Sequence, residues 1–267
     1  MQVGTGDLKV ERQGHVAVVT MHRPESRNAF SAEMLAAMAD AWDEIDEDDD
    51  VRVAVLTGAG GHFCAGADLR AMSAAPASQE RFSSQVDSEG ARPFRGMLRG
   101  PGLTKPLIAA VEGYAVAGGT EILLATDIRV AARSATFGVM EVTRGLFPLG
   151  GSTVRLRRQV PHTVAMELLL TGRLVSAEEA HQIGLVGRVV DDGQALATAL
   201  EIAEQIAGNG PLAVQAVKRS VQRTEAAPEA EALAVELEEG LPILGTRDAR
   251  EGPRAFAEKR PPRFEGA

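Results

Sequence analysis

The sequence predicts an α/β fold whose strands pair in parallel. In the first half of the chain, short apolar runs alternate with amphipathic segments and glycine-rich turns. Recurring units of strand, turn and helix are typical of parallel sheets, because the helix carries the chain back to the same edge of the sheet. From about Ser152 onward the pattern becomes almost wholly helical, so we expect the second half to pack as helices against or beside this sheet.

The first unit consists of one strand and one helix. Residues 15–23 (HVAVVTMHR) are rich in β-branched side chains and predict a strand. Residues 31–47 predict a helix, since Ser31 can accept a hydrogen bond from its first turn. One face of this helix is apolar at helical spacing, and it consists of Met34, Leu35, Met38, Trp42 and Ile45.

The following segments repeat the unit. Strands are expected at residues 51–60, 106–113 and 127–138, and helices are expected to begin at the turns FCAGADL (63–69) and AGGTE (117–121). Pro161, Gly172, Gly184 and Gly210–Pro211 divide the helical half, and a short strand interrupts it at 187–190. No linker composition separates the two halves, so we expect one domain over residues 1–267 with a helical extension.

Composition excludes several classes of protein. The 28 basic and 37 acidic residues give a net charge of −9, which argues against nucleic acid or an anionic membrane as the main partner. The lone cysteine, Cys64, excludes an internal disulfide and fits a reducing compartment. The N-terminal segment has no apolar stretch typical of a signal peptide, and no apolar run reaches membrane-spanning length. We therefore expect a soluble cytoplasmic protein.

Two glycine-rich turns, FCAGADL and YAVAGGTE (114–121), carry most of the functional information. Each can direct a free backbone N–H group at one point in space. Two such groups that converge on one oxygen form an oxyanion hole, which stabilises the negative charge developing on a carbonyl. The sequence thus indicates chemistry beside a carbonyl group.

Two carboxylates accompany these turns. Glu121 precedes an apolar run, and Glu141 follows Val139 and Met140, so we expect both side chains to be buried. Two buried carboxylates facing one water molecule raise the pKa of one member and let the pair share a proton. Proton transfer beside a carbonyl is the predicted chemistry.

Five segments together resemble the crotonase superfamily, in the same order and at similar spacing, over about residues 8–264. They are FCAGADL, AAVEGYAVAGGTE, MEVTRGLFPLGG, LLLTGRLVSAEEAHQIGLV and EGPRAFAEKRPPRF. With a glutamate at both acidic positions, the chain is similar to the enoyl-CoA hydratase branch. It differs where Glu112 stands in place of a frequent Asn, Ala117 in place of the first of three glycines, and Met140 in place of a common Pro.

The resemblance implies a ββα spiral core over about residues 1–200 and a helical trimerisation region over about 201–267. It assigns the oxyanion hole to the N–H groups of Ala67 and Gly118. Glu121 would deprotonate a water molecule for attack at Cβ of an enoyl-CoA thioester, and Glu141 would give a proton to Cα. No metal or separate cofactor is implied, because coenzyme A is part of the substrate.

The resemblance also implies coenzyme A contacts and a homotrimer or a hexamer made of two trimers. The residues expected to bind the substrate's coenzyme A are Ser26, Arg27, Ala29, Ala65, Asp68, Leu69, Phe256 and Lys259. The last two match a pair that reaches the nucleotide of a neighbouring subunit. Arg27, Arg70 and Lys259 would supply local positive charge to a protein that is acidic overall. Residues 71–100 are polar and serine-rich, and we expect a mobile helix and loop over the site.

Other functions remain open at this stage. An enoyl-CoA isomerase, a carnitinyl-CoA-type dehydratase and a thioester hydrolase share the implied fold, although isomerases often keep only the second carboxylate. A non-enzymatic RNA-binding relative is opposed by the net charge of −9. The run GAGG (58–61) lacks the third glycine of a dinucleotide fingerprint, and DEIDEDDD (43–50) lacks the glycine and final glutamate of a calcium loop.

Overall fold

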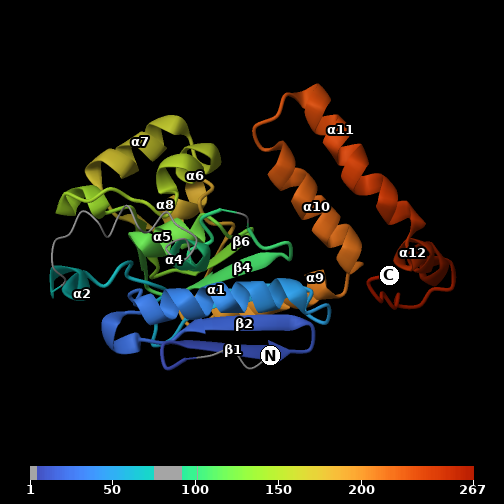
Figure 1. Cartoon of the computed structure of the whole chain (residues 1–267), viewed down its shortest axis with the longest axis horizontal. Helices are drawn as coiled ribbons and strands as arrows, with labels where there is room; N and C mark the ends of the chain where they lie inside the picture. The colour runs from blue at the N-terminus through green and yellow to red at the C-terminus, as the bar shows by residue number, and fades with distance from the viewer. Residues whose placement is uncertain (1–4, 75–91, 101) are drawn as a thin grey trace.

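The computed structural model describes residues 5–74, 92–100 and 102–267. Within them the larger sheet has the strand order β1-β2-β3-β4-β6-β9 (Figure 1). Its strands are β1 (Leu8–Gln13), β2 (Val16–Met21), β3 (Val53–Gly58), β4 (Leu107–Val111), β6 (Ile128–Ala132) and β9 (Arg188–Val190). β1 and β2 form an antiparallel hairpin, and all the other neighbours are parallel. The predicted parallel pairing is therefore confirmed.

A smaller sheet joins β5 (Tyr114–Val116), β7 (Thr136–Gly138) and β8 (Val175–Ser176). β5 is parallel to β7, and β7 is antiparallel to β8. The expected strand at 127–138 is thus two strands, β6 and β7, which belong to different sheets. Because β4 continues into β5 after a short turn, the small sheet begins where the large one ends.

The remaining elements are helical. In chain order they are η1 (Pro24–Ser26), α1 (Ala32–Glu47), α2 (Leu69–Ala74), α4 (Arg92–Gly96), α5 (Gly118–Leu123), η3 (Glu141–Arg144), α6 (Ser152–Gln159), α7 (His162–Thr171), α8 (Ala177–Gln182), α9 (Ala195–Ala207), α10 (Pro211–Thr224), α11 (Glu229–Gly240), η4 (Leu241–Gly245) and α12 (Arg247–Ala257). The structure describes only the ends of the expected mobile segment at 71–100, and its residues 75–91 lie outside the described ranges.

Helix α1 forms as the sequence predicts. The Ser31 hydroxyl accepts a hydrogen bond from Met34 N at 2.9 Å, which satisfies one of the N–H groups of the first turn. Four of the five apolar side chains on the predicted face are fully buried, and Leu35 packs at the edge of the same core. Trp42 Nε1 donates to Gly96 O at 2.9 Å, so α1 also fixes the position of α4.

The large sheet is covered on both faces, and alternate residues of each strand enter different cores. Ala17 and Val19 of β2 face the core that contains α1, whereas Val16 and Val18 face the core that contains α9. Strands buried on both sides read as continuous apolar runs. The expected division near residue 201 falls inside α9, whose residues Ala195–Ala207 pack on the sheet.

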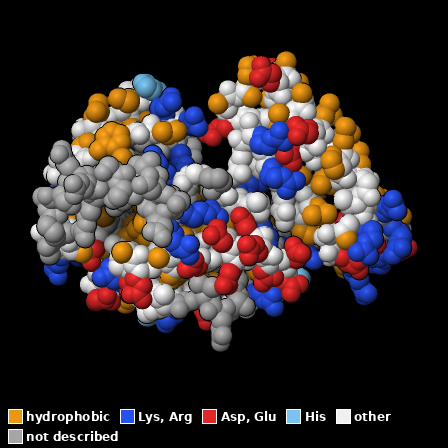
Figure 2. Space-filling view, in the orientation of Figure 1, with side chains coloured by type: hydrophobic (Ala, Val, Ile, Leu, Met, Phe, Trp, Pro, Cys, Tyr) orange, Lys and Arg blue, Asp and Glu red, His pale blue; other side chains and the backbone are white. Residues whose placement is uncertain are grey.

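Helices α10, α11 and α12 project from the sheet as a separate layer (Figure 1). Lys218 of α10 connects this layer to the core, because its Nζ donates to Asp127 Oδ2 at 2.7 Å and to Lys105 O at 2.8 Å. Many apolar side chains of these helices are exposed, and Figure 2 shows hydrophobic atoms along α11. They include Val217, Val221, Leu233 and Leu237, and Leu241 and Leu244 of the adjoining η4 are exposed as well. Among the described residues, no helix combines the length and apolarity needed to cross a bilayer.

A strained residue at the start of α5 gives a test of the fold. Ala117 has φ +50° and ψ −124°, a backbone conformation that suits glycine and is costly for residues with a Cβ. We expect Ala117→Gly to raise the free energy of unfolding by about 1 kcal/mol. Chemical denaturation of the two proteins at one pH measures the difference, and a less stable variant would contradict the strain.

Candidate active site

The two glycine-rich turns lie against each other. Gly66 has φ +86°, and a Cβ atom built on it would lie 2.7 Å from Ala117 Cβ and 2.9 Å from Gly118 N. No side chain fits there, so only glycine permits the approach. Two hydrogen bonds, Cys64 N to Tyr114 O at 2.8 Å and Val116 N to Cys64 O at 3.0 Å, pair the segments.

Both backbone donors of the candidate oxyanion hole are available. The neighbours of Ala67 are engaged, since Phe30 N donates to Gly66 O at 2.8 Å and Asp68 N donates to Phe30 O at 3.2 Å. The N–H of Ala67 itself finds no acceptor in the described part of the chain, and neither does that of Gly118 at the first position of α5. The contact at Gly66 thus brings together two turns that each hold an unused donor.

Glu121 is anchored deep in the fold. All six residues of α5 are buried, and Glu121 is only 3% exposed. Its Oε1 accepts hydrogen bonds from Ser152 N at 3.2 Å and Ser152 Oγ at 3.0 Å. On the other side, a Cβ built on Gly150 would lie 2.7 Å from Glu121 Oε2, so glycine is needed here for the carboxylate to fit.

Glu141 has the opposite surroundings. It begins the short helix η3 and is half-buried, although we expected it to be buried. Its Oε2 is shielded from solvent and has no hydrogen-bond partner among the residues that the structure describes. Burial, with the negative charge of Glu121 adding to it, raises the pKa of Glu141 to about 7. The expected rise in one pKa of the pair therefore falls on Glu141.

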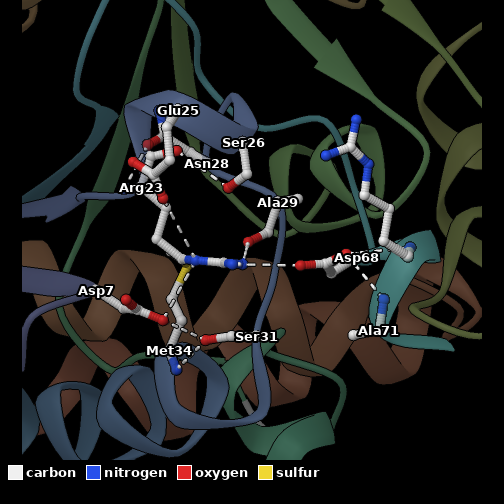
Figure 3. Close-up of polar contacts among 11 residues, drawn as sticks. Asp7, Arg23, Glu25, Ser26, Asn28, Ala29, Ser31, Met34, Asp68 and Ala71 are labelled. Carbon is white, nitrogen blue, oxygen red and sulfur yellow. Dashed lines mark hydrogen bonds and ion pairs between the residues drawn. The ribbon is translucent and has the colours of Figure 1, made fainter. Parts of the chain in front are cut away.

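Several candidate coenzyme A residues gather around Arg23 (Figure 3). Its guanidinium donates to Ala29 O at 2.7 Å and to Asp68 Oδ2 at 3.2 Å, and its backbone N–H donates to Asn28 Oδ1 at 2.9 Å. The Ser26 hydroxyl donates to Arg23 O at 3.1 Å. Arg23 was not among the residues expected from the sequence, although it lies at the start of residues 23–30 (RPESRNAF), which contain Ser26, Arg27 and Ala29, and its contacts hold this loop together.

The carboxylate of Asp68 is already in use. Its Oδ1 accepts hydrogen bonds from Arg70 N and Ala71 N, both at 3.1 Å, at the start of α2. These bonds and the contact with Arg23 keep the pKa of Asp68 below its usual value, with the Ala71 N–H as the largest cause. The side chain of Asp68 therefore shapes the loop beside Ala67, while Leu69 next to it is 47% exposed.

Arg27 and Ala65 lie on the same side of the molecule as these turns. Ala65 N donates to Arg27 O at 3.0 Å, which pairs the two candidate segments. The Arg27 guanidinium carbon lies 5.2 Å from the centre of the Tyr114 ring, and Tyr114 also stacks on His62 with 5.1 Å between ring centres. Arg27 has φ +53°, so the loop turns sharply at this residue.

Phe256 and Lys259 are not brought to this cluster within one chain. They lie on and just after α12, at the side of the molecule opposite to α2 (Figure 1). Phe256 is 87% exposed, and Lys and Arg side chains gather around α12 in Figure 2. Among the described residues no group of three or more His, Cys, Asp or Glu side chains could hold a metal ion.

Comparisons with known proteins identify the family of this chain. A family model described as enoyl-CoA hydratase/isomerase matches residues 11–267. Enoyl-CoA hydratase EchA19 of Mycobacterium tuberculosis is 55% identical over 97% of this chain and 96% of its own length. (E)-benzylidenesuccinyl-CoA hydratase of Thauera aromatica is 41% identical over 97% of this chain and 99% of its own.

Solved structures show the same fold. A crystal structure of enoyl-CoA hydratase from Bacillus anthracis superposes with a TM-score of 0.91 at 36% identity, covering 98% of this chain and all of the other. The match extends through the sheets and the C-terminal helices, which agrees with the predicted α/β class. The chain belongs to the enoyl-CoA hydratase/isomerase family, the crotonase family.

Proposed function

We propose that this protein is an enoyl-CoA hydratase, a lyase that adds water across the 2,3 double bond of an enoyl-CoA thioester. The observation that carries the proposal is a pair of unlike carboxylates beside two unused backbone donors. Glu121 accepts two hydrogen bonds, whereas Glu141 has a shielded oxygen without a partner and a pKa near 7. Hydration needs one base and one acid, and this pair offers both.

The thioester carbonyl binds between the N–H groups of Ala67 and Gly118. As water attacks Cβ, negative charge moves onto the carbonyl oxygen and the two donors stabilise it. Their placement supports this role, because close packing at Gly66 and backbone hydrogen bonds at Cys64 hold the two turns against each other. Donors that are already oriented need no reorganisation during the reaction.

The two glutamates divide the proton transfers. Glu121 accepts a proton from the attacking water, and Glu141 gives its proton to Cα. The raised pKa of Glu141 fits this role, because a carboxyl group must hold its proton near neutral pH to act as an acid. Loss of water from a 3-hydroxyacyl thioester uses the same groups in reverse. An isomerase could work with Glu141 alone, so the anchored Glu121 favours the hydratase.

We further infer that the chain is one domain that assembles as a homotrimer or as a hexamer. The exposed apolar side chains of α10, α11 and η4 exceed what a soluble monomer normally leaves uncovered. Assembly would also carry Phe256 and Lys259 to the substrate of a neighbouring subunit. Ser26, Arg27, Ala29, Ala65, Asp68 and Leu69 would surround the coenzyme A portion within one chain.

We predict that Glu121→Gln and Glu141→Gln each lower the turnover of a short enoyl-CoA by about 10²-fold or more, the usual scale for a positioned acid or base. Loss of the conjugated enoyl absorbance measures the rate. Glutamine preserves the shape of either side chain, so circular dichroism should remain unchanged. If Glu121→Gln keeps full activity while Glu141→Gln has none, the isomerase replaces the hydratase.

The pH dependence follows from Glu141. Hydration requires its proton, which is bound below a pKa of about 7 and is lost as the pH rises through that value. We therefore expect kcat/KM for hydration to decline above about pH 7. In Glu121→Gln the neighbouring negative charge is absent, so the pKa of Glu141 falls and the residual activity declines at lower pH. An unchanged kcat/KM up to pH 9 would contradict Glu141 as the acid.

The subunit contact has its own test. We expect Phe256→Ala and Lys259→Ala to weaken coenzyme A binding, measured by calorimetry, while kcat at saturating substrate changes little. Lys9→Ala, on the exposed edge strand β1, is the matched control and should bind normally. Sedimentation should show trimers or hexamers for the parent protein and for all three variants. A parent protein that is monomeric and still binds coenzyme A with full affinity would refute the cross-subunit contact.

A further inference from the structure

Two carboxylates that lie close together need a feature that decides which of them keeps the proton. We propose that Ser152, supported by the charge of Arg155, is this positioning residue: the first turn of α6 holds Glu121 ionised and leaves the proton on Glu141. The inference rests on the proposed function, since it explains how that function's base and acid are assigned.

Ser152 contacts Glu121 with two donors at once. It is fully buried, and its N–H and its hydroxyl both donate to Glu121 Oε1, at 3.2 and 3.0 Å. The backbone donor would be present with any residue at this position, so the hydroxyl is what serine adds. Gly151, with φ +114°, turns the chain so that Ser152 faces the carboxylate at the start of α6. Hydrogen bonds donated to a carboxylate favour its charged form.

Arg155 adds charge to the same turn. Its Nη2 donates to Leu98 O at 2.6 Å, and its Nη1 is shielded from solvent without a hydrogen-bond partner in the described part of the chain. The side chain folds back over the start of the helix, since a Cβ on Gly151 would lie 3.3 Å from Nη1. A Cβ on Gly150, the residue before Gly151, would lie 2.7 Å from Glu121 Oε2. The guanidinium of Arg155 thus lies beside Gly151, and the preceding residue, Gly150, lies beside the carboxylate of Glu121.

The charged groups around Arg155 come from several elements. Burial lowers its pKa, the charges of Glu225 and Glu121 raise it, and Arg99 lowers it. Arg129 lies within electrostatic reach but is hydrogen-bonded to the carbonyls of Leu123 and Leu185. Glu225 also faces Arg158, at 3.3 Å. Arg155 therefore attracts both Glu121 and Glu225, and Glu225 has a second cationic partner in Arg158.

Glu141 receives no comparable help. Burial and the charge of Glu121 both raise the pKa of Glu141, and only the backbone N–H of Glu141 itself lowers it. Both features of the first turn of α6 act on Glu121. The difference between the two carboxylates therefore arises from which of them faces α6, and the proton remains on the other.

The test should titrate one carboxyl group at a time. In Glu141→Gln, infrared difference spectra of the free enzyme follow the protonation of Glu121 against pH. We expect Ser152→Ala in this background to move the titration midpoint to higher pH by roughly one unit or more, the scale of a hydrogen bond to a charged acceptor. Thr153→Ala, which removes the neighbouring hydroxyl, is the matched control and should leave the midpoint unchanged.

Arg155 needs a pair of variants, because it also ties α6 to Leu98. Arg155→Lys keeps the charge, and Arg155→Gln keeps a hydrogen-bond donor without the charge. If the charge matters, the midpoint rises in the Gln variant and stays near the parent value in the Lys variant. Equal shifts in both variants would assign Arg155 a structural role and overturn its part in the proposal.

The outcome is independent of whether the protein hydrates enoyl-CoA. The titrations use the enzyme without substrate, so a chain that catalyses another reaction would still reveal which carboxyl group holds the proton. The parent protein should show the infrared signal of a protonated carboxyl group near neutral pH. This signal should be absent from the single variant Glu141→Gln and present in the single variant Thr153→Ala. An unchanged midpoint when Ser152→Ala is added to Glu141→Gln would refute the proposal, even if the hydratase activity were established.

Discussion

The close contact between the Gly66 turn and the Ala117–Gly118 turn determines the geometry around it. Backbone meets backbone there, at a separation that leaves no room for a Cβ on Gly66. There is also no room for a Cβ on Gly119, the residue after Gly118, because it would lie 2.2 Å from Cys64 O. Because β3 leads to one turn and β4 to the other, the parallel pairing of these strands sets the two donors side by side.

The site combines rigid donors with two carboxylates in contrasting surroundings. Glu121 belongs to a helix that is buried along its whole length, whereas Glu141 begins a short helix near the surface. Burial and the charge of Glu121 raise the pKa of Glu141 to about 7, whereas Glu121 accepts two hydrogen bonds from Ser152. This contrast supports the proposed roles of Glu121 as the base and Glu141 as the acid.

The local elements could be predicted from the sequence, and the contacts between distant segments could not. Ser31 and the apolar face of α1 identify that helix, and the apolar run after Glu121 indicates its burial. In contrast, the hydrogen bonds from Ser152 to Glu121 and from Arg23 to Asp68 join residues 31 and 45 positions apart. No local pattern marks such pairs, because they form only when the sheets and turns have assembled. For the same reason, the sequence did not predict that residues 127–138 form two strands, β6 and β7, in different sheets.

The position of α9 has a consequence for how the chain is made. This helix ends at Ala207 and buries the sheet face formed by Val16, Val18, Val53 and Val55. During synthesis, that face stays uncovered until most of the chain has left the ribosome, even though its strands are among the first residues to emerge. Exposed apolar strands are prone to aggregate, so the docking of α9 late in synthesis removes an aggregation-prone surface. Solubility during expression should thus respond to α9 more than to the early strands that it protects.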